Sequence, residues 1–167
     1  ELGDGTTTDR LVATQVSTGA TFKALTSGGD YFTCGLTPSG AASCWGTNTF
    51  GQLGDGSRIT RLSPVAVPQH AFTVITAGRW HACGLESTGT AYCWGYNGTG
   101  ELGDGTITQR LNPVPVAGKH HFATLAAGAD YTCGIDTGGT VYCWGSNGYG
   151  QLGDGSTLYR SIPVAVT

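Results

Sequence analysis

The sequence predicts an all-β fold in which β-propeller blades of four antiparallel strands follow one another along the chain. Three observations lead to this prediction: a composition suited to tight turns, a repeat of roughly 50 residues, and four short extended runs in each repeat. Glycine is the most common residue, at 29 of 167, while methionine is absent and charged residues make up only 11%. No stretch places apolar residues at helical spacing, so almost no helix is expected.

Two short motifs define the repeat. Leu-Gly-Asp-Gly occurs four times, at residues 2–5, 53–56, 102–105 and 152–155. Cys-Trp-Gly occurs three times, and two residues after it an asparagine follows each time, at Asn48, Asn97 and Asn147. The motifs divide one propeller segment, residues 1–167, into three and a third repeats: units 1–50, 51–100 and 101–150, and a partial unit 151–167.

Within the unit 51–100, four extended runs of four to six residues are expected to be strands, at 64–67, 72–77, 81–86 and 90–94. Each run is rich in β-branched or aromatic residues and is bounded by Gly, Pro, Ser or Thr. Four strands in a period of roughly 50 residues are typical of a propeller blade.

The six cysteines form three identical pairs, because a second cysteine stands ten residues before each Cys-Trp-Gly. Residues 87–89 lie midway between Cys83 and Cys93 and predict a hairpin turn that brings these two cysteines opposite each other. Opposed residues of antiparallel strands have Cα atoms about 4.5–5.5 Å apart, which a disulfide accepts. The expected disulfides are Cys34–Cys44, Cys83–Cys93 and Cys133–Cys143. Zinc binding is disfavoured, because two thiols per unit make no tetrahedral set.

The combined pattern Cys-Trp-Gly-x-Asn-x-x-Gly-Gln-Leu-Gly-Asp-Gly resembles the repeat of the regulator of chromosome condensation family, over the whole chain. The resemblance implies a propeller, usually of seven blades, that works as a binding scaffold. The paired cysteines depart from what is expected of nuclear members and resemble secreted bacterial relatives.

The recurring tryptophans and Asp/Arg pairs are expected to have structural roles. Each tryptophan, at Trp45, Trp94 and Trp144, alternates in the pleat with a cysteine, so it should face away from the disulfide and fill the gap to the next blade. An arginine follows each Leu-Gly-Asp-Gly aspartate after six residues, which favours an ion pair or turn clasp. The pairs are Asp4 and Arg10, Asp55 and Arg61, Asp104 and Arg110, and Asp154 and Arg160.

No metal or cofactor is expected. A calcium loop needs alternating Asp-x-Asp ligands, which the sequence lacks. The histidines, at His70, His81, His120 and His121, do not recur in register and are expected to be isolated surface residues. Nothing resembles a nucleophile elbow, a phosphate-binding loop or a paired acid and base, so the chain is not expected to be an enzyme.

Segments that differ between repeats point to the candidate binding loops. The strongest divergence comes before the first cysteine of each pair, where the candidate residues are Asp30, Tyr31, Arg79, Trp80, Asp130 and Tyr131. Two further variable stretches follow Cys-Trp-Gly, one at residues 49–50, 98–99 and 148–149 and the other at 58–60, 107–109 and 157–159. Variable aromatic and charged loops on a rigid scaffold are typical of a protein-binding face. Asn97-Gly98-Thr99 is a glycosylation acceptor sequence, and we expect it in an exposed loop.

The sequence thus predicts a secreted, non-catalytic protein-interaction or scaffold module. The alternatives are guanine-nucleotide exchange on a small GTPase, which the resemblance suggests, a secreted enzyme inhibitor, and a carbohydrate-binding propeller. A net charge of −3 and a pI near 5.7 argue against nucleic acid as a partner, and the apolar runs are too short for a membrane span. Because three blades are too few to close a ring, the chain is expected to be part of a longer array of about seven blades. The alternatives are further copies of itself as partners, in a dimeric ring or a filament.

Overall fold

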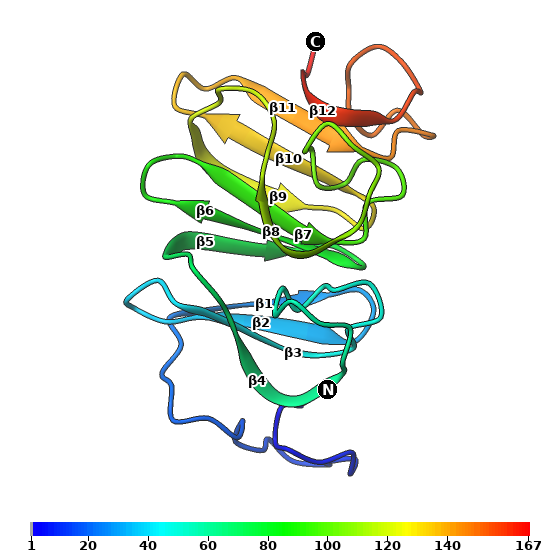
Figure 1. Ribbon diagram of the computed structural model, residues 1–167. Coiled ribbons are helices and arrows are strands. Elements are labelled where there is room, and N and C mark those ends of the chain that lie inside the picture. Colours follow the sequence, from blue (N-terminus) through cyan, green and yellow to red (C-terminus); the bar gives the residue numbers. More distant parts are fainter. Residues whose placement is uncertain (1) are drawn as a thin grey trace.

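The computed structural model describes residues 2–167 and contains three four-stranded antiparallel sheets stacked on one another (Figure 1). This arrangement confirms the predicted all-β blades. Blade 1 consists of β1 (Ala24–Gly28), β2 (Phe32–Leu36), β3 (Ala42–Gly46) and β4 (Arg61–Val67). Blade 2 consists of β5 (Phe72–Ala77), β6 (His81–Glu86), β7 (Ala91–Gly95) and β8 (Arg110–Pro115). Blade 3 consists of β9 (Phe122–Ala127), β10 (Tyr131–Asp136), β11 (Val141–Gly145) and β12 (Arg160–Ala165).

The blades are out of phase with the sequence units. The outer strand of each blade lies after the next Leu-Gly-Asp-Gly motif, so β4, in the unit 51–100, pairs with β3 in the unit before it. A register shift between Cys44 and Gly46 lets the outer strand begin at Arg61, three residues before the predicted start. Residues 2–17 match residues 53–68 in the repeat and lie against blade 1, where Gly5 donates a backbone hydrogen bond to the Leu62 carbonyl.

The three disulfides form as predicted. In each blade the two cysteines stand directly opposite each other on the central strands, with a Cα–Cα distance of 4.1 Å. The described residues contain no free cysteine. The first two disulfides lie on the side of their blade that meets the next one: Cys34 and Cys44 share a buried cluster with Trp94 of blade 2, and Cys83 and Cys93 share one with Trp144 of blade 3.

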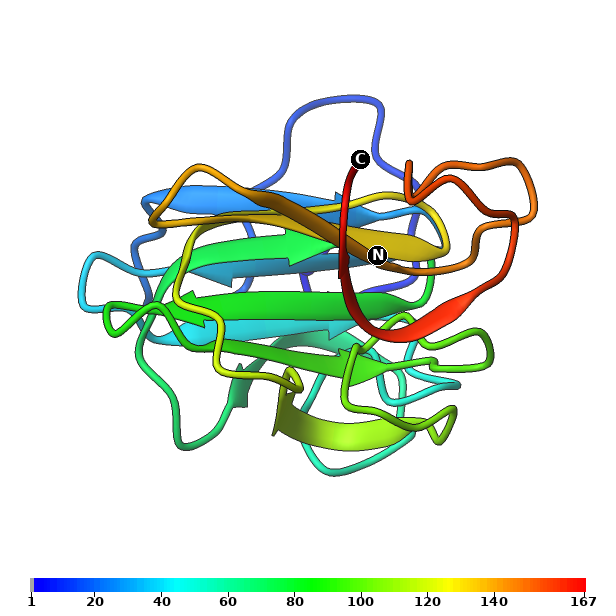
Figure 2. The same cartoon turned by 90° about the horizontal axis from the view of Figure 1, so that it is seen from above.

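The ends of the strands define two faces of the stack. The loop face holds the β1–β2 type turns, at residues 29–31, 78–80 and 128–130, and the long β3–β4 type loops, at 47–60, 96–109 and 146–159. The hairpin face holds the turns 37–41, 87–90 and 137–140, and the linkers between blades, 68–71 and 116–121. In Figure 2 the hairpin turns lie at the left and the long loops at the right. Within residues 2–167 no helix is long and apolar enough to cross a membrane.

Candidate functional site

The Asp/Arg pairs form the predicted clasps at the base of each long loop. Asp55 Oδ2 accepts hydrogen bonds from the Arg61 guanidinium at 2.8–3.0 Å, while Asp55 Oδ1 accepts from the amide and hydroxyl of Ser57. The aspartate side chains are buried and the arginines are about one third exposed, in all four copies. Burial raises the pKa of Asp55, but the hydrogen bonds from Ser57, Arg61 and Asn48 outweigh it and hold that pKa below its usual value. These hydrogen bonds fix the conformation of the loop.

The asparagine after each Cys-Trp-Gly holds the same loop from inside. Asn97 is fully buried; its Nδ2 donates to Asp104 Oδ1 and to the carbonyls of Thr106 and Thr108, and its Oδ1 accepts from Leu102 N. The expected exposure of the acceptor sequence is therefore wrong. N-glycosylation would modify the Nδ2 atom of Asn97, and in the folded chain that atom is buried and already donates hydrogen bonds. Asn48 makes the same contacts in its copy, and Asn147 makes them except for the bond to the second carbonyl.

Trp94 and Trp144 face away from the disulfides of their blades and fill a gap between blades, as predicted, but the gap is the one to the preceding blade and not to the next. Trp94 Nε1 donates to the Gln52 carbonyl in blade 1 at 3.0 Å, and Trp144 Nε1 donates to the Glu101 carbonyl in blade 2. These two tryptophans thus pack on the preceding blade. Gly54, with φ of 68°, lies against the Trp94 ring, and an added Cβ would come within 2.7 Å of Nε1. This contact explains the first glycine of the Leu-Gly-Asp-Gly motif.

The histidines differ from the expectation in two ways. His81 is not a surface residue: it is buried, and its Nε2 lies 2.9 Å from Thr132 Oγ1 of blade 3. His70 and His120 do recur in register, because each stands two residues before the first phenylalanine of a blade and stacks on that ring and on a tyrosine. The recurrence was missed because the matched positions in the first repeat hold Ala20 and Ser43.

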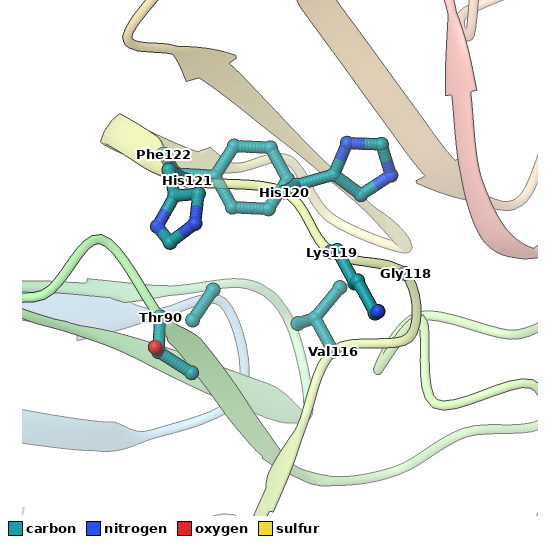
Figure 3. A pocket seen from close by; sticks show the side chains of 8 residues that line it. Thr90, Val116, Gly118, Lys119, His120, His121 and Phe122 are labelled. Atoms are coloured by element: carbon teal, nitrogen blue, oxygen red, sulfur yellow. The ribbon is translucent and has the colours of Figure 1, made fainter.

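A pocket on the hairpin face contains His120 and His121 together with Lys119, Val116 and Thr90. Figure 3 shows the two imidazole rings turned away from each other. His120 stacks on Tyr142, with ring centroids 4.3 Å apart, and His121 Nδ1 donates to the Thr88 carbonyl. Over residues 2–167 no three His, Cys, Asp or Glu side chains are grouped to hold a metal ion.

The candidate binding residues lie on the loop face, and most of them contact one another across blades. Trp80 Nε1 donates to Asp30 Oδ2, Arg79 lies over the Trp80 ring with its Cζ 5.1 Å from the centroid, and Arg79 Nη1 is 3.6 Å from Asp130 Oδ2. Tyr31 is 69% exposed. Tyr131 begins β10 and is only partly buried. The structure thus brings Asp30, Arg79, Trp80 and Asp130 together.

Two aromatic residues complete this group, and only one of them stood in a segment marked as variable. Phe50 packs on Trp80 and Tyr96, with ring centroids 5.4 and 5.0 Å apart, and Trp80 lies 5.4 Å from Tyr96. Tyr96 was missed, although the repeat carries the signal, since Thr47 and Ser146 hold the same position in the other copies. Phe50 comes from blade 1 and the other two residues from blade 2, so the cluster bridges the blades.

Solved structures that resemble the chain are propellers. Human WBSCR16 is 20% identical; the match covers 89% of this chain and 40% of the WBSCR16 chain, with a TM-score of 0.79. Yeast RCC1 (Prp20), solved bound to Kap60, is 21% identical; the match covers 87% of this chain and 37% of the Prp20 chain, with a TM-score of 0.77. The ectodomain of the Physcomitrella patens receptor kinase CR4 is 27% identical; the match covers 78% of this chain and 29% of the CR4 chain, with a TM-score of 0.52.

The chain spans about two fifths of the length of the first two of these structures. No curated protein matches it. A family model, described as the regulator of chromosome condensation (RCC1) repeat, matches residues 39–85, 88–135 and 138–167. A second model with the same description matches residues 24–52, 72–101 and 122–151. Together with the three blades and their repeated clasps, these matches show that the chain belongs to the RCC1 repeat family.

Proposed function

We propose that the chain is an extracellular, non-catalytic protein-interaction module that binds its partner through the loop face. The observation that carries the proposal is a convergence: all three sets of loop segments singled out as variable lie on that face, and they hold exposed aromatic and aliphatic side chains. The linkers 68–71 and 116–121 on the hairpin face also differ from each other, but no large apolar residue is exposed in them. Since the repeat keeps its clasps, disulfides and tryptophans constant, loops that vary and expose apolar residues on one face are what a specific binding surface on a rigid scaffold would show.

The distribution of exposed apolar side chains supports the same face. Of the large apolar residues that are exposed among residues 2–167, none lies in the turns and linkers of the hairpin face, whereas six lie in loops of the loop face. These six are Tyr31, Ile59, Ile107, Tyr149, Leu158 and Tyr159. Exposed aromatic and aliphatic residues that gather on one surface are typical of protein interfaces, which favours a protein over a nucleotide or a nucleic acid.

Two observations support an extracellular setting. The three disulfides use all six cysteines of the chain, and structural disulfides persist in oxidising compartments. The CR4 structure is that of an ectodomain. The likeness to Prp20, at 21–24% identity, concerns the fold alone, so it does not favour binding to a GTPase.

A pair of matched triple variants tests the loop face. In the first, Tyr31→Asn, Ile59→Ser and Ile107→Ser remove three exposed side chains from the loop face; in the second, Ser87→Ala, Lys119→Ala and Thr137→Ala alter the hairpin face. We expect the loop-face variant to lose at least about tenfold in affinity for proteins captured by the native chain, since apolar anchors contribute most of the energy of such interfaces. The hairpin-face variant should bind normally. Equal loss in both variants, or loss only in the second, would contradict the proposal.

The extracellular assignment has a separate test. When the source cells are lysed under thiol-trapping conditions, we expect all six cysteines to resist alkylation until a reductant is added, and most of the protein to be found outside the cytoplasm. Mass spectrometry of the peptides that contain Cys34, Cys83 and Cys133 measures this directly. Rapid alkylation of the native cellular protein would place it in a reducing compartment and refute the assignment.

A further inference from the structure

A shallow depression of about 410 Å³ opens on the loop face where the innermost strands of the three blades end. Its lining consists of Arg79 and six small residues, all glycine or alanine, at positions 29, 77–78 and 127–129. Arg79 is a departure from the repeat, because Gly29 and Ala129 hold the same position in the other two blades. The depression therefore presents a single charged side chain among backbone and methyl groups.

Arg79 is held in position by its neighbours. Its backbone N donates to the Ala129 carbonyl at 2.7 Å, and its guanidinium lies over the ring of Trp80. The ring in turn is fixed by the hydrogen bond to Asp30 and by Phe50 on the adjacent blade. Because the side chain is already ordered, little conformational entropy remains to be lost when a ligand binds to it.

The donors of this guanidinium are nevertheless unused. Within residues 2–167 no group accepts a hydrogen bond from the Arg79 side chain, and Asp130 Oδ2, at 3.6 Å, is beyond hydrogen-bond distance. In contrast, Arg10, Arg61, Arg110 and Arg160 each donate to the aspartate of their own clasp. A planar fork of free N–H donors beside an open depression matches the geometry of a carboxylate, which binds arginine in a bidentate manner.

We infer that this depression receives the carboxylate of an aspartate or glutamate side chain from the protein partner. The inference rests on the proposed function and specifies the chemistry of the partner at one point of the loop face. Asp130 approaches the same guanidinium from the rim and is an intramolecular competitor. Asp30 is not, since its carboxylate already accepts the Trp80 N–H.

The competing view is that Asp30 and Asp130 make the depression a site for a basic side chain. The two views predict opposite effects of two substitutions on the affinity for the ligand. For a carboxylate ligand, Arg79→Gln weakens binding and Asp130→Asn strengthens it, because the latter removes a competing negative charge. For a cationic ligand, both signs are reversed.

The test uses NMR titration of the whole chain with three blocked peptides, acetyl-Gly-Glu-Gly-amide and the same peptide with Gln or Lys at its centre. We expect the Glu peptide to bind about fivefold or more tightly than the Gln peptide, with shifts at residues 77–80 and 127–130. Arg79→Gln should abolish this preference, and Asp130→Asn should increase it about twofold. Equal binding of the Glu and Gln peptides, or a preference for the Lys peptide, would overturn the inference.

Arg58→Gln is the matched control, because Arg58 is also an exposed arginine of the loop face but lies in the outer loop of blade 1. This variant removes the same charge and should leave the Glu preference unchanged; an equal loss would mean that only the overall charge matters. The loop-face triple variant should also retain the preference, since none of its three positions lines the depression. Failure of the protein-binding test and failure of the carboxylate test are thus distinguishable.

Discussion

Replacing Trp94 with alanine is expected to lower the free energy of unfolding by about 3–5 kcal/mol, the range for removal of a fully buried tryptophan. The side chain is completely buried between blades 1 and 2, stacks on Phe72 with ring centroids 5.8 Å apart, and donates to the Gln52 carbonyl. The substitution therefore leaves both a cavity and a carbonyl without its donor. Chemical denaturation followed by circular dichroism, with the disulfides intact, measures the change.

Two further variants help to separate the effect of the cavity from that of the lost hydrogen bond. Trp94→Phe keeps most of the ring and removes the donor, so it should cost less than Trp94→Ala. Trp45→Ala, made at the same place in blade 1, should also destabilise the chain, because Trp45 is buried and packs on Phe22 and on Gly3. A loss below about 1 kcal/mol for Trp94→Ala would mean that the blades do not depend on this contact.

Features that depend on residues close in sequence were predictable. The hairpin that joins Cys83 to Cys93 needs only ten residues and an alternating strand pattern, so the disulfide followed directly. The clasp from Asp55 to Arg61 spans six residues and recurs at fixed spacing. Local geometry decides both of these contacts, and the repeat shows each of them several times.

Features that depend on the next blade were not predictable in the same way. The pleat shows that Trp94 faces away from the disulfide, but not which blade lies on that side. The phase between sequence unit and blade decides this, and the motifs alone do not fix that phase. The burial of Asn97 follows from a loop that folds back over its own start, through contacts up to eleven residues away, whereas a glycosylation sequence in a glycine-rich loop suggests exposure.

The candidate binding residues were found because an internal repeat shows which positions vary, but their grouping was not. The contact between Asp30 and Trp80 joins residues 50 positions apart, and Arg79 approaches Asp130 across the next junction. Equivalent positions in successive blades become neighbours when the blades stack. In a propeller, divergence at one repeat position therefore creates a continuous surface, which a single unit does not reveal.

His81 is the source of the second large effect, a loss of stability in mild acid. Thr132 Oγ1 donates to the Glu101 carbonyl, so it must accept from His81, and the proton of the neutral imidazole is on Nε2. Burial lowers the pKa of His81 from 6.5 to about 4. In the unfolded chain the same group titrates near its ordinary pKa, so between these values the unfolded state binds more protons than the folded state.

This difference in proton binding decides the direction in which stability changes with pH. The stabilisation is fully present above pH 6.5 and is lost as the pH falls toward 4, by about 2–3 kcal/mol between pH 6.5 and 4.5. Denaturation at several pH values in this window, compared with the double variant His81→Phe with Thr132→Ala, isolates the effect. The variant copies the junction between blades 1 and 2, where Phe32 and Ala82 hold these positions and are buried. Its stability should decline less over this window, by about the same 2–3 kcal/mol.

The window ends at pH 4.5 so that the clasps do not contribute. Hydrogen bonds from Ser156 lower the pKa of Asp154 to about 2, and the pKa values of Asp4, Asp55 and Asp104 are also lowered, so these carboxylates lose their stabilising ionisation only at more acidic pH. The other three histidines are present in both proteins and cancel in the comparison. Parallel curves for the two proteins from pH 7 to 4.5 would show that His81 is protonated without disturbing the junction. Divergence that begins near pH 6.5 and grows toward 4.5 would show that the contact between blades 2 and 3 depends on a neutral imidazole.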